Sequence, residues 1–111
     1  MPWQAKHRFA RISPTKVRLM ADMIRGRDAQ EAVDVLSFAP NRAAGIITKV
    51  LNSALANANE SEADVDRLYV KEVRVDAGPA MRRYRPKDRG RMHPIDKRTS
   101  HILVVVDEEQ R

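Results

Sequence analysis

The chain has 111 residues, of which 21 are lysine or arginine and 15 are aspartate or glutamate, and its pI is near 10.2. This length supports one modest hydrophobic core rather than two ordinary domains, and the basic excess favours a polyanionic partner over an acidic small molecule. The absence of cysteine excludes disulfides, thiolate metal sites and cysteine nucleophiles, and it fits a reducing compartment such as the cytosol or an organelle matrix.

The first predicted elements are a strand and a helix. Residues 3–12 alternate loosely in hydropathy and carry several cations, which predicts a short, exposed strand. Ser13-Pro14 then begins a helix of about residues 14–25. Serine can cap a free amide, proline suits the first helical position, and Gly26 can adopt the left-handed conformation that ends a helix. The side of this helix expected to face the core carries Val17, Met20, Ala21 and Ile24, and another side carries Arg18, Asp22 and Arg25.

Two further helices are predicted before the middle of the chain. Asp28 is expected to cap the second helix, with Glu31 as its reciprocal capping partner, and Pro40 ends it. A third and longest helix starts near Asn41. Its apolar face is formed by Ala43, Ile47, Val50, Ala54 and Ala58. The residues that we expect at the centre of the core are Val17, Ile24, Leu36, Ile47, Val50 and Val104.

The second half of the body is predicted to form strands. Glu60–Asp66 contains four acids and indicates a solvated loop. Leu68 to Val75 changes its alternation phase, which predicts a bulge near Lys71-Glu72. Ile102–Val106 is β-branched and suits a strand inside an antiparallel sheet. This longest aliphatic run is far below the roughly 20 residues of a membrane span. Because the first residues also lack a signal-peptide apolar stretch, we expect neither a transmembrane nor a secreted protein.

The charge is segregated along the sequence. Residues 1–27 have seven basic and one acidic residue (net +6), and residues 28–80 have five and nine (net −4). Residues 81–98 have eight and two (net +6), and residues 99–111 have one and three (net −2). The alternative is a uniformly solvated basic surface, which predicts no such segregation. The distribution favours a bipolar molecule with one RNA-binding face.

Residues 77–100, between the two body strands, carry the second basic segment. Pro86 and Gly90 disfavour a helix, so we expect a β-hairpin that turns near Asp88-Arg89-Gly90. Basic side chains would lie on both of its faces, and the hairpin could project up to about 40 Å. An isolated, charged two-stranded ribbon is marginally stable in water, so an external partner such as RNA must hold it. The alternative is a disordered basic loop.

Four stretches, in matching order and spacing over nearly the whole chain, resemble the bacterial L-twenty-two family of large-subunit ribosomal proteins. They are Ala5-Lys6-His7-Arg8, Lys16-Val17-Arg18-Leu19 with Ile24-Arg25-Gly26, Asp76-Ala77-Gly78-Pro79, and Lys97-Arg98-Thr99-Ser100-His101-Ile102. The resemblance implies an α+β fold, with three helices packed on a small antiparallel sheet and a long protruding basic β-hairpin. It implies a single domain with a body of residues 1–76 and 101–111 and a hairpin arm of residues 77–100.

The resemblance also implies a function. The chain is expected to be a structural component of the large ribosomal subunit that binds large-subunit rRNA and assists subunit assembly, with a hairpin that lines the nascent-peptide exit tunnel. The residues expected to face the tunnel are Met81, Arg82, Arg83, Arg89, Gly90, Arg91 and Met92. Asp88 departs from the family pattern, in which a small residue is usual at this position.

The predicted RNA-binding residues come from both basic segments and from the root of the arm. They are Lys6, His7, Arg8, Arg11, Lys16, Arg18, Arg25, Arg82, Arg83, Arg85, Lys87, Arg89, Arg91, Lys97, Arg98, Thr99, Ser100 and His101. The expected partners are large-subunit rRNA, neighbouring large-subunit proteins and the nascent polypeptide. The expected location is the cytoplasm, with an organelle ribosome as the alternative.

Two other classes of function are alternatives for this sequence. A DNA-bending architectural protein also uses β-arms rich in arginine and proline. An enzyme would have to use His7, His93 or His101 with scattered acids, yet the sequence has no His-Glu-x-x-His motif and no phosphate-cradling glycine loop. His101 is more simply a hydrogen-bonding residue at the root of a strand. We therefore predict no enzymatic activity, no cofactor and no metal.

Overall fold

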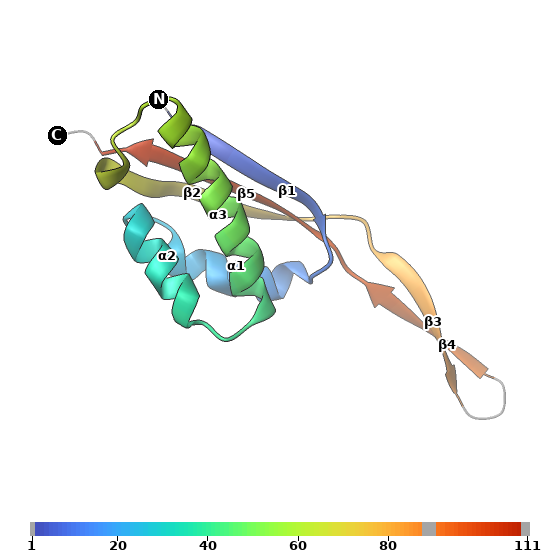
Figure 1. Cartoon of the computed structure of the whole chain (residues 1–111). Coiled ribbons are helices and arrows are strands. Elements are labelled where there is room, and N and C mark those ends of the chain that lie inside the picture. Colours follow the sequence, from blue (N-terminus) through green and yellow to red (C-terminus); the bar gives the residue numbers. More distant parts are fainter. Residues whose placement is uncertain (1, 88–90, 110–111) are drawn as a thin grey trace.

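The computed structural model describes the backbone of residues 2–87 and 91–109, and the side chains of residues 2–80 and 97–109. Figure 1 shows three helices, a sheet and a hairpin that projects from the body. In chain order the elements are β1 Trp3–Ala10, α1 Pro14–Ile24, α2 Ala29–Phe38, α3 Arg42–Glu60, a short 3-10 helix Val65–Arg67, β2 Leu68–Ala77, β3 Met81–Lys87, β4 Arg91–Lys97 and β5 Ser100–Glu108.

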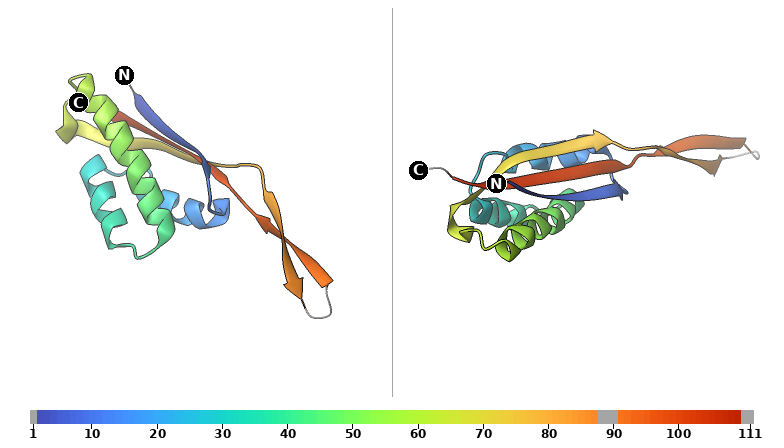
Figure 2. Two further views of the ribbon diagram at one scale, coloured as in Figure 1. Left: turned by 45° about the vertical axis from the view of Figure 1, so that its right-hand side comes forward. Right: turned by 90° about the horizontal axis from the view of Figure 1, so that it is seen from above.

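The body has two layers. An antiparallel three-stranded sheet in the order β1-β5-β2 forms one layer, and the helices cover one of its faces while the other face stays open (Figure 2, right). The predicted α+β fold is therefore confirmed. The β-branched strand β5 lies in the middle of the sheet, and the pairing of β2 with β5 shifts register between Val70 and Glu72, both as predicted.

The hydrophobic core lies between the helices and the sheet. All six residues predicted at its centre are buried, and so is the whole predicted apolar face of α3. Its alanines leave little side-chain bulk between α3 and the sheet, which lets the helix pack closely against β1 and β5. In the described part of the chain, no helix is both long enough and apolar enough to cross a membrane.

The helix ends differ in part from the prediction. Gly26 has φ of +84° and ends α1 as expected. Ser13 and Asp28 occupy the N-cap positions of α1 and α2, but neither side chain makes a capping hydrogen bond, so that part of the prediction is wrong. The side chain of Glu31 pairs with Arg27 instead, and the backbone of Asp28 forms an isolated bridge with Tyr69.

The hairpin arm continues from the ends of β2 and β5. Strands β3 and β4 pair antiparallel from Met81 opposite Lys97 to Lys87 opposite Arg91. The arm makes the molecule elongated, with extents of 66 × 24 × 17 Å (Figure 1). The predicted turn at residues 88–90 lies outside the described residues.

Candidate nucleic-acid interface

The base of the arm is fastened to the body by buried polar side chains. The amide of Gly78 donates to the carbonyl oxygen of Thr99 at 2.9 Å, and Thr99 Oγ1 donates to the carbonyl oxygen of Pro79 at 2.7 Å. Ser100 Oγ donates to the carbonyl oxygen of Ile12 at 2.6 Å. Thr99 and Ser100 are only 3% and 0% exposed. Thr99 thus joins the two strands at the base of the arm, and Ser100 joins the arm to the body. Both side chains are buried in the described structure, and their predicted contact with RNA remains a prediction.

His101 continues this junction on the side of β1. Its Nδ1 atom accepts a hydrogen bond from the amide of Phe9 at 3.1 Å, and the two rings meet edge to face with centroids 4.8 Å apart. Phe9 has φ of +58° and lies where the pairing of β1 with β5 changes register. His101 is therefore a hydrogen-bonding residue at a strand root, as predicted. Its predicted contact with RNA remains a prediction.

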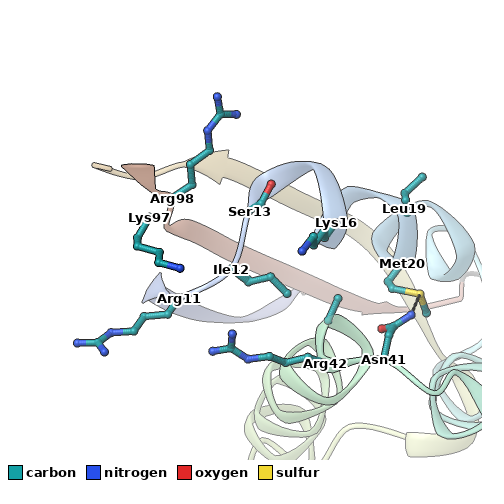
Figure 3. A pocket seen from close by; sticks show the side chains of 11 residues that line it. Arg11, Ile12, Ser13, Lys16, Leu19, Met20, Asn41, Arg42, Lys97 and Arg98 are labelled. Atoms are coloured by element: carbon teal, nitrogen blue, oxygen red, sulfur yellow. Dashed lines mark hydrogen bonds between the residues drawn. The ribbon is translucent and has the colours of Figure 1, made fainter. Parts of the chain in front are cut away.

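A basic groove of about 960 Å³ opens beside this junction (Figure 3). Arg11 follows β1, Lys16 lies in the first turn of α1, and Arg42 is the first residue of α3. Lys97 and Arg98 enter from the base of the arm. Three segments that are far apart in sequence, residues 11–20, 41–43 and 97–98, thus bring five cations together. The uncharged residues of the lining are Ile12, Ser13, Leu19, Met20, Asn41 and Ala43, so no carboxylate lines the groove among the described residues.

A second, smaller hollow of about 260 Å³ lies between β1 and α3. Lys6, His7 and Arg8 line it from the strand, and Lys49 lines it from the helix. Arg42 and Lys49 were missed by the sequence analysis, because they belong to a segment of net negative charge. Their spacing of seven residues, close to two helical turns, places them on one side of α3 and is the signal that identifies them.

Arg18 and Arg25, whose predicted contact with RNA remains a prediction, make hydrogen bonds within the body. Arg18 Nη2 donates to the carbonyl oxygen of Val75 at 3.1 Å, and Arg25 Nη2 donates to that of Val73 at 2.7 Å. At Val70, whose side chain is buried, the backbone amide donates to the carbonyl oxygen of Arg27 and the carbonyl oxygen accepts from the amide of Gly26. The free edge of β2 is thereby closed by α1 and the turn after it.

The acidic residues lie away from the groove. The carboxylates of residues 60–66 are exposed at the end of the body opposite to the arm (Figure 1). On β2, Arg74 pairs with Glu72 and Asp76, and Lys71 pairs with Asp107 of β5. The described part of the body is therefore polarised, with unbalanced positive charge near the arm and negative charge at the far end.

The remaining predicted site residues belong to the arm. Their side chains lie outside the described residues: Met81, Arg82, Arg83, Arg85, Lys87, Arg89, Gly90, Arg91 and Met92. Among the side chains that are described, no three His, Asp or Glu residues come together as a metal site.

Comparisons with known proteins agree over the length of the chain. Residues 5–107 match the family model described as "Ribosomal protein L22p/L17e". The large ribosomal subunit protein uL22 of Geobacter sulfurreducens is 49% identical over 111 residues, which cover 99% of this chain and 100% of that protein.

Proposed function

Because the chain belongs to the ribosomal protein L22p/L17e family, we propose that it is a structural, non-enzymatic part of the large ribosomal subunit that binds rRNA through its basic groove and its arm. The observation that carries this proposal is the convergence of Arg11, Lys16, Arg42, Lys97 and Arg98 on one groove without a lining carboxylate. The five cations that line one groove repel one another, and phosphates bound in the groove relieve this repulsion.

The arm supports the same function. It consists of two strands that pair only with each other, so its faces are not covered by the body. Such a ribbon is stabilised by a partner that surrounds it. The arm segment has eight basic and two acidic residues between positions 81 and 98, which suits folded RNA. We propose that the arm threads through large-subunit rRNA and that its outer half lines the nascent-peptide exit tunnel.

The finer assignments follow from this orientation. The nascent polypeptide would pass the residues expected to face the tunnel. Of these, Arg91 lies at the outer end of the paired strands, whereas Arg82 and Arg83 lie in the half of β3 nearer the body. Neighbouring large-subunit proteins would contact the body, and the acidic loop of residues 60–66 would face solvent. The expected location is the cytoplasm, within assembled ribosomes.

The proposal is tested by crosslinking-mapped footprinting of the intact protein on large-subunit rRNA. Photoreactive groups in the basic groove and in the arm should crosslink to rRNA, whereas one at Ser61 should not. Duplex DNA added at equal salt should not displace the RNA, in contrast to the behaviour of a DNA-bending protein. Crosslinks that arise mainly from the acidic end of the body would contradict the proposal.

A further inference from the structure

The basic groove has an apolar wall that phosphate binding does not require. Leu19, Met20, Ile12 and Ala43 line the groove, but Ile12, Met20 and Ala43 are only 7%, 5% and 4% exposed, so Leu19 presents most of the accessible apolar side chain. Leu19 is 68% exposed and is one of the most exposed large hydrophobic residues of the described chain. A surface that only neutralised phosphates would gain nothing from these side chains. Their position beside five cations indicates a ligand that has both an anionic part and an apolar part.

The two parts of the groove are separated in space. Figure 3 shows Leu19, Met20 and Asn41 at one end, and Arg11 with the cationic head of Lys97 at the end toward the arm. Arg42 reaches along the groove toward the arm, and Lys16 lies between the two ends. A ligand bound here would have its apolar part against α1 and its charges toward the arm.

Asn41 adds a directional polar group to the apolar end. Its Oδ1 atom accepts a hydrogen bond from the amide of Ala44 at 2.9 Å, which fixes the orientation of the side-chain amide. Its Nδ2 atom is 3.4 Å from the sulfur of Met20, a weak acceptor. Among the described residues the Nδ2 group has no other acceptor, and Asn41 is exposed, so its second hydrogen can be donated to a ligand.

We propose that the groove binds one unpaired nucleotide of the RNA, with its base against Leu19 and its flanking phosphates on the cations. A nucleobase has flat apolar faces and acceptor atoms at its edge, which Asn41 can meet. Proteins recognise RNA sequence mainly at such splayed-out bases, because the grooves of an A-form duplex hide them. The volume of about 960 Å³ also lies within the range of nucleotide-sized ligand sites.

This inference rests on the proposed function, since it names the part of the RNA that the groove takes. An acidic peptide is the competing ligand, because it too combines carboxylates with apolar groups. The nucleotide is favoured because the groove is continuous with the basic root of the arm, through Lys97 and Arg98, and a single RNA strand can follow both surfaces.

The test is a methyl NMR titration of the full chain with uridine or adenosine 5′-monophosphate, with inorganic phosphate at equal ionic strength as the reference. The nucleotides should shift the methyl signals of Leu19, whereas phosphate should not. Leu19→Ser should weaken nucleotide binding by roughly fivefold, as expected for the loss of a partial apolar contact. Met23→Ser is the matched control. Met23 is 46% exposed on the same helix one turn later but does not line the groove, so this variant should change binding by less than about twofold.

Three results would overturn the inference: equal methyl shifts with phosphate and with nucleotide, equal affinities of the two serine variants, or methyl shifts with a glutamate-rich peptide but not with nucleotides. Binding of the intact protein to a large-subunit rRNA fragment separates this failure from failure of the proposed function. If the fragment is bound and the titration fails, only the nucleotide site is wrong. If the fragment is not bound, the proposed function is wrong.

Discussion

The guanidinium of Arg25 donates a hydrogen bond of 2.7 Å to the carbonyl oxygen of Val73, across 48 residues of sequence. Arg18 makes the equivalent contact with Val75, about two turns earlier along the helix and two residues later on β2. Unpaired carbonyl groups on the edge of a sheet can accept hydrogen bonds from a strand of another molecule, and here two arginine side chains bind them. These arginines therefore contribute to the integrity of the body.

Arg25→Ala should lower the free energy of unfolding by about 1 kcal/mol, because a charged hydrogen bond is lost at a half-exposed site. Its affinity for rRNA should change little. Lys16→Gln, in the basic groove, should show the opposite pattern, with unchanged stability and weaker RNA binding. Chemical denaturation and a filter-binding assay measure the two quantities. If Arg25→Ala weakens RNA binding as much as Lys16→Gln and leaves stability unchanged, Arg25 is an RNA ligand after all.

Val50→Ala should destabilise the body by roughly 1–3 kcal/mol, through lost burial and a residual cavity between α3 and the sheet. Val50 is only 4% exposed and lies on the apolar face of α3. Val65→Ala is the control, because Val65 is 47% exposed, and it should change stability by less than about 0.5 kcal/mol. Equal unfolding midpoints for Val50→Ala and the unaltered protein would show that Val50 does not contribute to the stability of the core.

Gly78→Ala and Gly45→Ala should have opposite effects on stability. A Cβ atom at Gly78 would lie 2.5 Å from Thr99 Oγ1 and 3.3 Å from the ring of His101, so the buried junction at the base of the arm must shift. We expect a cost of about 1–3 kcal/mol. A Cβ atom at Gly45, inside α3, meets nothing within 4 Å, and alanine there should stabilise the helix by about 0.5–1 kcal/mol. Thermal unfolding of both variants gives the comparison, and a neutral Gly78→Ala would show that the junction is loose.

Deleting residues 81–96 removes six basic residues of the arm but keeps Lys97 and Arg98 in the groove. Joining Ala80 to Lys97 through an Asn-Gly turn should leave the body folded. If the six cations neutralise phosphates, the slope of log affinity against log salt should fall in magnitude by about 4–5. Weak binding should persist through the body. A salt titration on a large-subunit rRNA fragment measures both slopes, and indistinguishable slopes would mean that the arm takes no part in the electrostatics.

A bulky maleimide label at Ser61→Cys should not prevent incorporation into large subunits, because the exposed acidic end of the body is expected to face solvent. The chain has no natural cysteine, so the label is confined to one position. The same label at Lys97→Cys, which lines the groove, should block incorporation. Sedimentation of reconstituted particles reads out the result. Equal inhibition from both positions would contradict the polarised orientation.

Most of the architecture could be predicted from the sequence because it follows from periodicity. The spacing of Ala43, Ile47 and Val50 defined the buried face of α3, and the phase change near Lys71-Glu72 defined the bulge in β2. Capping was harder, because several groups compete for the same donors. The backbone of Asp28 bridges to Tyr69, and Arg27 takes Glu31, so the predicted capping pair does not form.

The candidate site could be predicted only in part, because the sequence shows charge but not what each charge faces. Arg11, Lys16, Lys97 and Arg98 meet in the groove, as the two basic segments suggested. Arg42 joins them from a segment of negative net charge. Arg18 and Arg25 donate hydrogen bonds to carbonyl oxygens at the edge of β2. These carbonyl groups lack a strand partner only once the sheet has formed, so the sequence does not reveal them. The contact of Ser100 with Ile12 likewise joins chain segments that are 88 residues apart in sequence.

The arm is joined to the body by two short connections, residues 78–80 between β2 and β3 and residues 98–99 between β4 and β5, and β5 is held on both sides by β1 and β2. A pull along the arm is therefore carried by strands that run in nearly the same direction (Figure 1). Many interstrand hydrogen bonds then bear the load together, in shear, whereas a sideways pull would open them one after another. The connection is thus mechanically strongest along the axis on which RNA that grips the arm would draw it.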